Sequence, residues 1–129
     1  MDKLGIGRKM ERLVMNRWEA DGFDCWQPKR SASYGPGTDI FGLFDFVAVK
    51  SDCSVNFVQV KRRRAKEAET ARERIKSWQD GHSAPTACFL VLWHKERRTE
   101  RLVFRAERYY GGDEYCDWSA WDSWEIEKR

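Results

Sequence analysis

The sequence predicts an α/β domain in which a central mixed β-sheet is flanked by helices. Three observations carry this prediction. Residues 8–21 place apolar side chains at the spacing of one helix face, and two β-rich runs follow on either side of a short polar link. A continuous apolar run then follows a second, highly charged helical segment, as expected for a strand buried on both faces. With 129 residues, of which 41% are hydrophobic and 35% charged, the chain suits one folded domain over residues 1–129.

The expected elements begin with the amphipathic helix over residues 8–21, which Gly22 ends. A short strand is expected over residues 23–27, and Pro28 closes it because proline has no N–H to donate to a sheet ladder. Residues 30–38 follow as a loop rich in serine and glycine, whose small side chains would let the backbone approach a ligand closely.

The two β-rich runs, residues 44–50 and 55–61, predict an antiparallel hairpin around the polar link 51–54. The remaining expected elements are a helix over residues 62–80, a buried strand over 87–93, a half-buried strand over 101–107 and a last edge strand over 123–126.

Composition favours a cytoplasmic protein without a membrane segment. No apolar run approaches the roughly 20 residues that span a bilayer, and the first residues lack the apolar centre of a signal peptide. The four cysteines are Cys25, Cys53, Cys88 and Cys116. Their wide spacing argues against a zinc ribbon, and we expect free thiols that are mostly buried. Three tryptophans, Trp118, Trp121 and Trp124, are expected to pack on the sheet, with a dimer contact as the alternative.

The net charge of +3 is unevenly distributed. Residues 61–76 contain eight basic and three acidic side chains, whereas residues 113–127 contain six acidic side chains and no basic one. A basic stretch beside a polar site suits a polyanion, because Lys and Arg release counterions when they contact phosphates. A solvated helix face is the alternative interpretation of such a stretch.

Polar residues at the ends of the hairpin form the candidate site. If the turn is centred in the link 51–54, the numbers of paired residues add up to about 105. Asp45 then lies opposite Val60, within one position of both Gln59 and Lys61. Since side chains alternate between the faces of a strand, Asp45, Gln59 and Lys61 can converge at one end of the hairpin.

This set of side chains suits metal-dependent phosphate chemistry. A carboxylate, an amide oxygen and the main-chain carbonyl of Val60 offer the hard oxygen ligands that Mg²⁺ prefers. A bound metal lowers the pKa of its water and neutralises charge on a phosphate, and Lys61 could polarise that water or stabilise a developing oxyanion. A surface hairpin whose ends happen to be polar is the alternative.

The surrounding residues resemble the core of the PD-(D/E)XK nuclease superfamily. Glu11 lies eleven residues before Gly22, a Ser/Gly-rich loop follows, Asp45 leads an apolar strand, and residues 59–61 read Gln-Val-Lys before three arginines. The sequence is most similar to archaeal-type Holliday junction resolvases, a group that also occurs in phages, and the resemblance covers residues 8–64. It implies a restriction-endonuclease-like fold with an αβββαβ core, and a homodimer that cuts four-way DNA junctions in recombination and repair, in the cytoplasm or, for a phage protein, in that of the host.

The resemblance also implies roles for individual residues. The metal, Mg²⁺ with Mn²⁺ able to substitute, would be bound by Asp45, Gln59 and Glu11, and Lys61 would assist catalysis. A loop serine, Ser33 or else Ser31, would contact the scissile phosphate. The residues expected to bind DNA are Arg30, Ser31, Arg62, Arg63 and Arg64.

Two departures from the family pattern leave alternatives open. Gln59 stands where a glutamate is usual, as it does in Mrr-like restriction enzymes, so a restriction- or repair-type nuclease is one alternative. A DNA-binding protein that keeps the fold without activity is another. Asp39, which follows Thr38, competes with Asp45 for the metal, although its place before Gly42 suits the start of a strand less well.

Overall fold

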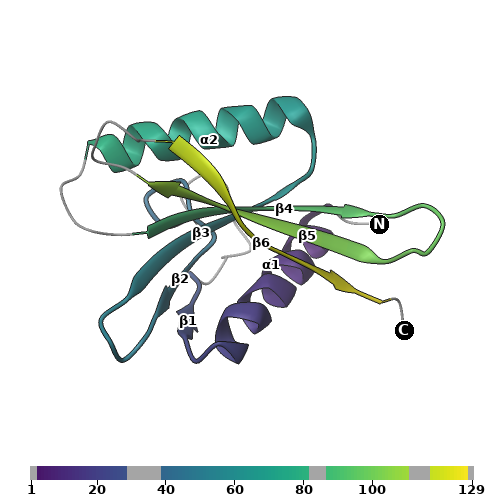
Figure 1. Cartoon of the computed structure of the whole chain (residues 1–129), viewed down its shortest axis with the longest axis horizontal. Helices are drawn as coiled ribbons and strands as arrows, with labels where there is room; N and C mark the ends of the chain where they lie inside the picture. Colours follow the sequence, from purple (N-terminus) through teal and green to yellow (C-terminus); the bar gives the residue numbers. More distant parts are fainter. Residues whose placement is uncertain (1–2, 29–38, 82–86, 111–116, 128–129) are drawn as a thin grey trace.

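A computed structural model of the chain describes residues 3–28, 39–81, 87–110 and 117–127, and shows an α/β protein with two helices and one six-stranded mixed sheet (Figure 1). The elements in chain order are α1 (Lys3–Ala20), β1 (Asp24–Trp26), β2 (Phe46–Val49), β3 (Val55–Arg62), α2 (Ala65–Asp80), β4 (Ala87–Lys95), β5 (Leu102–Tyr110) and β6 (Asp117–Ile126). The predicted mixed sheet with flanking helices is confirmed at this level.

The strands lie in the sheet in chain order, from β1 to β6. Only β3 and β4 are parallel, and the other neighbouring pairs are antiparallel. The parallel pair requires a crossover, which α2 supplies. The two helices cover opposite faces of the sheet (Figure 1). None of the helices in the described ranges is long and apolar enough to cross a membrane.

The α1 face contains the larger aromatic core. Trp18 is almost completely buried, and its ring makes edge contacts with Phe46 and Phe89 at centroid distances of 5.8 and 5.4 Å. The helix presents Met10, Val14 and Trp18 to the sheet at a spacing of four residues, which places them on one side of a helix. This amphipathic pattern is the one the sequence predicted, although α1 starts at residue 3 rather than 8.

The α2 face contains a second core around Phe44, Ile75 and Leu90. The buried residues of α2 are Ala68, Ala71, Ile75 and Gln79. Small side chains near the start of α2 and larger ones near its end make the two ends of the helix different. The first turns therefore leave space beside the sheet, while the later turns pack closely on it.

The last strand is longer than expected, since β6 spans ten residues rather than the four predicted. A β-bulge opposite Ala106 and Glu107 shifts its register. The bulge lets Trp121 stack on Trp18, at a centroid distance of 5.4 Å, while Trp124 stacks on Phe104 at 5.3 Å. These tryptophans pack on the protein's own sheet, as expected.

The cysteines match the prediction only in part. Cys25, Cys53 and Cys88 are free, and Cys116 lies outside the described residues. Cys88 is buried and Cys25 half-buried, but Cys53 is exposed in the hairpin turn. Burial raises the pKa of the Cys88 thiol to about 12, so that this group stays protonated at physiological pH.

The hairpin between β2 and β3 differs by one position from the expected register. Phe46 pairs with Val58, because residues 51–53 form the loop and Ser54 already bonds Lys50, whose N–H donates to the Ser54 carbonyl at 3.0 Å. Cys53 takes a left-handed conformation with φ of 73°, as in hairpins whose loop ends in a bulge. A glycine or asparagine at this position would have predicted that conformation, but the residue is a cysteine.

Candidate metal and nucleic-acid site

Asp45 lies directly before β2 and is bonded to β3. Its main-chain N–H donates to the Val58 carbonyl at 2.9 Å, although Val58 pairs with Phe46, so the regular ladder is interrupted at Asp45. Its side-chain Oδ2 accepts a hydrogen bond from the Val60 N–H at 2.7 Å. Asp45 therefore contacts Val60, the residue it was expected to face, although the register of the hairpin differs by one position.

Gln59 has an unusual environment for an amide side chain. It is 5% exposed, and its Oε1 atom is buried without a hydrogen-bond partner in the described part of the chain. A buried acceptor that loses water and gains nothing costs about 1–3 kcal/mol. Most buried polar atoms in folded proteins have a hydrogen-bond partner. An oxygen without one therefore indicates either a position that binds a ligand or one that destabilises the fold.

A pocket of about 250 Å³ opens beside these residues, between the end of β3 and the start of α2. The lining residues are Gln59, Lys61, Lys66, Glu67, Thr70, Ala71 and Arg74. Lys61 lies two residues after Gln59, and therefore on the same face of β3. Three cations and one carboxylate line the pocket, which makes it positively charged and suited to a phosphate group.

Arg74 also links the pocket to the turn that leads into Asp45. Its Nη2 donates to the Gly42 carbonyl at 3.2 Å. The turn is tight, since the Phe44 N–H donates to the Ile40 carbonyl at 2.9 Å, and Gly42 has a φ of +66° that glycine adopts without strain. The helix, the turn and the hairpin thus hold one another in place around the pocket.

Glu11 belongs to α1, which packs on the opposite face of the sheet. It is buried, and its Oε1 accepts a short hydrogen bond from Gln27 Nε2. Gln27 follows β1, whose Trp26 pairs with Val47, so Glu11 lies toward the end of the sheet at which β2 begins. Asp45 occupies that same end.

The three arginines after Lys61 do not form one surface. The Arg62 guanidinium lies over the Trp93 ring, 5.5 Å from its centroid, on the α1 side of the sheet. Arg63 and Arg64 line a different pocket, on the other flank of α2. All three are exposed. The three arginines that were expected to bind DNA therefore lie on separate surfaces.

Several expected site residues cannot be placed. Arg30, Ser31 and Ser33 lie outside the described residues. Asp39 begins the turn before Asp45 and accepts a hydrogen bond from the Gly42 N–H through its carbonyl at 3.1 Å. Of the two aspartates, Asp45 is the one whose side chain is bonded to β3, at Val60.

The helix side of the pocket was missed at the level of sequence. Lys66, Thr70 and Arg74 recur every four residues, and this spacing could have identified one side of α2. Which strand that side would face could not be inferred, because it depends on how α2 rotates about its axis as it crosses the sheet.

Within the described ranges, no three or more His, Cys, Asp or Glu side chains are grouped closely enough to hold a metal by themselves. An amide such as Gln59 is not among those residue types. Comparisons of the chain with protein-family models, with curated proteins and with solved structures found no match.

Proposed function

We propose that this protein is a metal-dependent DNA endonuclease that hydrolyses phosphodiester bonds. The observation that supports the proposal most is the buried Gln59 oxygen, which has no hydrogen-bond partner among the described residues and belongs to a pocket lined by Lys61, Lys66 and Arg74. Asp45 is bonded to Val60, the next residue of β3. The proposed activity needs a metal ligand set, a cation near the attacked phosphate and a positive surface for the substrate. Each of these has a candidate among the described residues.

The residues present fit a hard divalent cation. The Gln59 Oε1 atom is an acceptor in need of a positive partner, and the carboxylate of Asp45 is bonded to the next residue of β3, Val60. The Val60 carbonyl is a third candidate, because the N–H and C=O of one strand residue point to the same side and the N–H points to Asp45. Mg²⁺ or Mn²⁺ would supply a water of lowered pKa and neutralise charge on the phosphate.

The chain's own side chains would then hold the substrate. Lys61, two residues beyond Gln59, can donate to a water or to a phosphate oxygen at the pocket floor. Lys66 and Arg74 come from α2 and can bind flanking phosphates as charge-assisted donors. Glu67 lines the same pocket and keeps its net charge moderate.

The substrate class rests on the sequence resemblance, and we propose four-way DNA junctions cut by a homodimer. Two symmetric cuts need two sites, which a twofold pair supplies. The element order α1, β1, β2, β3, α2, β4 supports a restriction-endonuclease-like arrangement, since it is the αβββαβ order that the resemblance implies. Glu11, buried near the same end of the sheet, is the proposed additional ligand or orienting group.

Two other functions have to be distinguished from this one. A restriction- or repair-type nuclease would share the site but prefer another DNA form. A DNA-binding protein without activity is favoured by one observation: Gln59 contributes a neutral oxygen, so that Asp45 supplies the only negative charge of the hairpin pair.

A cleavage assay tests the proposal. The protein is incubated with labelled four-way junction, flap, duplex or single strand, in Mg²⁺, Mn²⁺ or EDTA. We expect junction cleavage in either metal and none in EDTA. Asp45→Asn and Lys61→Ala should lower the rate at least 100-fold, as for loss of a metal ligand or a positioned cation. The matched controls, Asp24→Asn on β1 and Lys76→Ala late in α2, are exposed and should keep the wild-type rate.

The outcomes separate the three functions. Cleavage of junction and duplex at equal rates would replace the resolvase by another nuclease. DNA binding without cleavage in either metal would leave a binding protein. Equal loss of activity in the control variants would mean that the assay reports overall charge or folding rather than the site.

A further inference from the structure

A second pocket lies on the other flank of α2, and it is larger than the first. Its volume is about 720 Å³, and its charged and polar lining residues are Arg63, Arg64, Glu69, Arg72, His94 and Arg105. We call it the arginine groove. Of this set, only Arg63 and Arg64 were expected from the sequence to bind DNA.

The groove exists because of how the strands end and the helix begins. β4 and β5 extend past the start of α2, so that Leu92 and Arg105, which are paired, form its floor. Ala65 and Ala68 of α2 also line it, and their methyl side chains leave the space between helix and sheet open. Arg63 is fixed at the rim, because its N–H donates to the Trp93 carbonyl at 2.7 Å.

The two pockets lie on opposite sides of the same helix. At about 100° per residue, Ala65, Ala68 and Arg72 fall on one flank of α2. Lys66, Thr70 and Arg74 fall roughly on the other flank, which is the side of the metal-site pocket. The row of buried α2 residues runs between the two flanks.

An ion pair orders the groove without cancelling its charge. The Arg72 guanidinium binds Glu107 through Nε at 2.6 Å and Nη2 at 2.8 Å, and this contact raises the pKa of Arg72. The Nη1 donors of Arg72 remain for another acceptor. Arg105 lies 3.6 Å from the same Glu107 carboxylate. Arg63 makes no ion pair with a described residue.

The lining holds four arginines against Glu69, so it is positive. When Glu107, which binds Arg72, is counted as well, the groove has an excess of two positive charges. The carboxylate of Glu67 lies 3.7 Å from Arg64, but both side chains are more than half exposed, and such a pair contributes little.

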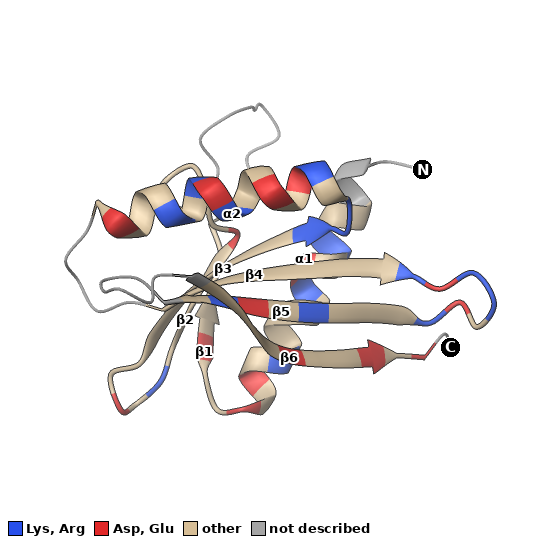
Figure 2. Cartoon of the chain, turned by 45° about the horizontal axis from the view of Figure 1, so that its top comes forward, with Lys and Arg blue, Asp and Glu red and all other residues tan. Residues whose placement is uncertain are grey.

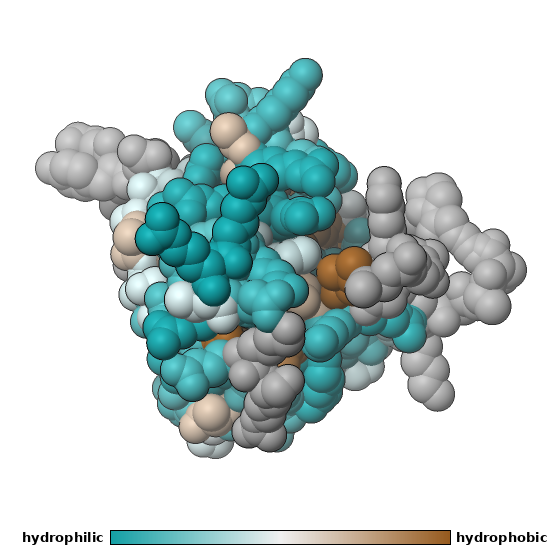
Figure 3. All heavy atoms as spheres, turned by 90° about the vertical axis from the view of Figure 1, so that its right-hand side faces the viewer, coloured by the Kyte–Doolittle hydropathy of each residue, from teal (hydrophilic) through white to brown (hydrophobic). Residues whose placement is uncertain are grey.

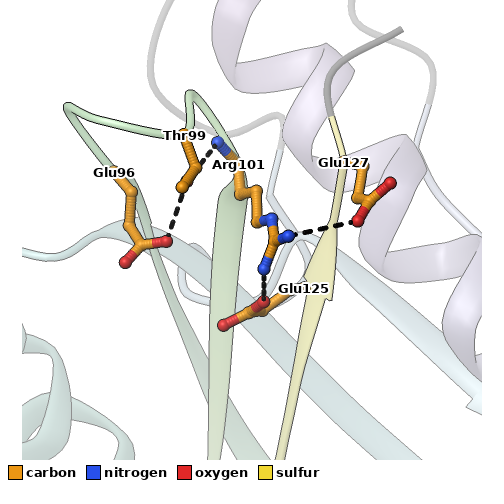
Figure 4. Close-up of polar contacts among 5 residues, drawn as sticks. All are labelled: Glu96, Thr99, Arg101, Glu125 and Glu127. Atoms are coloured by element: carbon orange, nitrogen blue, oxygen red, sulfur yellow. Dashed lines mark hydrogen bonds and ion pairs between the residues drawn. The ribbon is translucent and has the colours of Figure 1, made fainter.

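The elements that line the groove carry this charge. Figure 2 shows Lys and Arg at the end of β3, at the start of α2 and on β5. Figure 3 views the molecule from the side at which these ends meet, and most of the described surface there is hydrophilic. Arg101 forms separate ion pairs at 3.3 Å with Glu125 of β6 and with Glu127, which follows this strand (Figure 4).

We propose that the arginine groove binds the phosphodiester backbone of a nucleic-acid strand, separately from the metal-site pocket. The inference rests on the proposed function in taking DNA as the ligand. A strand fits better than a single phosphate, because the arginines come from the end of β3, from α2 and from β5 and are spread along the groove. Each can contact a different phosphate, and each contact adds to affinity and to its salt dependence.

The test measures binding where cleavage cannot occur. Protein carrying Asp45→Asn is titrated in EDTA against a fluorescent DNA junction and a single strand, at several salt concentrations. The groove variant adds Arg63→Ala and Arg105→Ala. We expect affinity to fall about 10-fold or more and the slope of log affinity against log salt to fall by about 2, one for each lost phosphate contact. Arg12→Ala, an exposed arginine of α1 paired with Glu19, is the matched control and should change neither.

The outcomes distinguish the groove from the proposed activity. If Arg63→Ala and Arg105→Ala leave affinity and slope equal to the control, the groove does not bind DNA, whatever the cleavage assay shows. If they weaken binding while the unmutated protein fails to cut DNA in Mg²⁺ or Mn²⁺, the groove stands and the nuclease does not. Displacement of DNA by inorganic phosphate or polyglutamate, at matched ionic strength and equal charge concentration, would overturn a strand-specific groove. A melting curve shows whether the variant folds, and Arg63→Ala alone, at an exposed position, serves if the double variant does not.

Discussion

Replacing Gln59 by methionine should stabilise the protein while removing its metal site. Methionine has nearly the same length and no strong hydrogen-bond acceptor, so Gln59→Met removes the buried Oε1 that lacks a partner. In most proteins the loss of a buried polar side chain is destabilising. Here the opposite sign is expected, because the oxygen has no hydrogen bond to lose.

The size of the effect follows from the burial of the side chain. Gln59 is 5% exposed, so its oxygen bears nearly the full cost of desolvation, about 1–3 kcal/mol. Methionine fills the space less well than an ideal apolar residue, and we therefore expect a gain of about 1 kcal/mol in the free energy of unfolding. For a chain of this size that gain raises the melting temperature by about 4 °C.

The assay is thermal unfolding in EDTA, followed by circular dichroism. Gln79→Met is the matched control, since Gln79 is similarly buried but its Oε1 accepts a hydrogen bond from Cys88 Sγ at 2.9 Å. The control should therefore lose stability. Gln59→Glu buries a carboxylate at a position that is 5% exposed and should lower the melting temperature in EDTA, because a buried charge without a cation is costly. The same variant should show a larger rise with Mn²⁺ than the wild type, about 1.4 kcal/mol for each tenfold gain in metal affinity.

A single result would refute this reasoning. If Gln59→Met loses as much stability as Gln79→Met, its oxygen is satisfied in solution and offers nothing to a metal. If Mn²⁺ or Mg²⁺ does not raise the melting temperature of Gln59→Glu, Asp45 and residue 59 do not form a cation site.

Three further predictions address other parts of the structure. Arg72→Ala should cost about 2 kcal/mol in unfolding measurements, because it removes both hydrogen bonds of Arg72 to the partly buried Glu107 and leaves this carboxylate only the 3.6 Å contact with Arg105; the side chains of the Arg72–Glu107 pair are 30% and 11% exposed, between a surface pair and a buried one. Iodoacetamide at pH 8 should alkylate Cys53 within minutes and Cys88 only on unfolding, as followed by peptide mass spectrometry, since the first is exposed and the pKa of the second is about 12; equal rates would mean that the hairpin and β4 open together. Glu11→Gln should retain part of the metal-induced rise in melting temperature that Asp45→Asn abolishes, because Glu11 belongs to the other helix, and a complete loss would make it a direct ligand.

The fold was predictable because its strongest signals are local. The apolar run of β4 and the helical spacing in α1 depend on residues close together in sequence, and both elements lie where they were expected. The hairpin register was not predictable to one residue, because it depends on a left-handed Cys53 that no residue type announced. The bulge in β6 was not predicted either, because no glycine or proline within the strand marks its position.

The candidate site was predictable only on its hairpin side. Asp45 lies just before β2, and Gln59 and Lys61 lie on β3. Because a short loop joins these two strands, their proximity can be predicted by counting residues from the loop. The arginine groove joins residues as far apart as Arg63 and Arg105, through a parallel pair and an antiparallel pair of strands. No local pattern records such a meeting.

The position of α2 has a consequence for how binding and cleavage relate. The helix separates a small pocket lined by Gln59 and Lys61 from a larger groove lined by four arginines. Charges in the groove can add to affinity without touching the reacting phosphate, so groove variants should raise the DNA concentration needed for half-maximal cleavage and leave the maximal rate nearly unchanged. Loss of Lys61 should do the reverse, because its contribution belongs to the reacting phosphate. If the groove variants and the Lys61 variant both lowered only the maximal rate, the pocket and the groove would act as one continuous site, and α2 would not separate binding from cleavage.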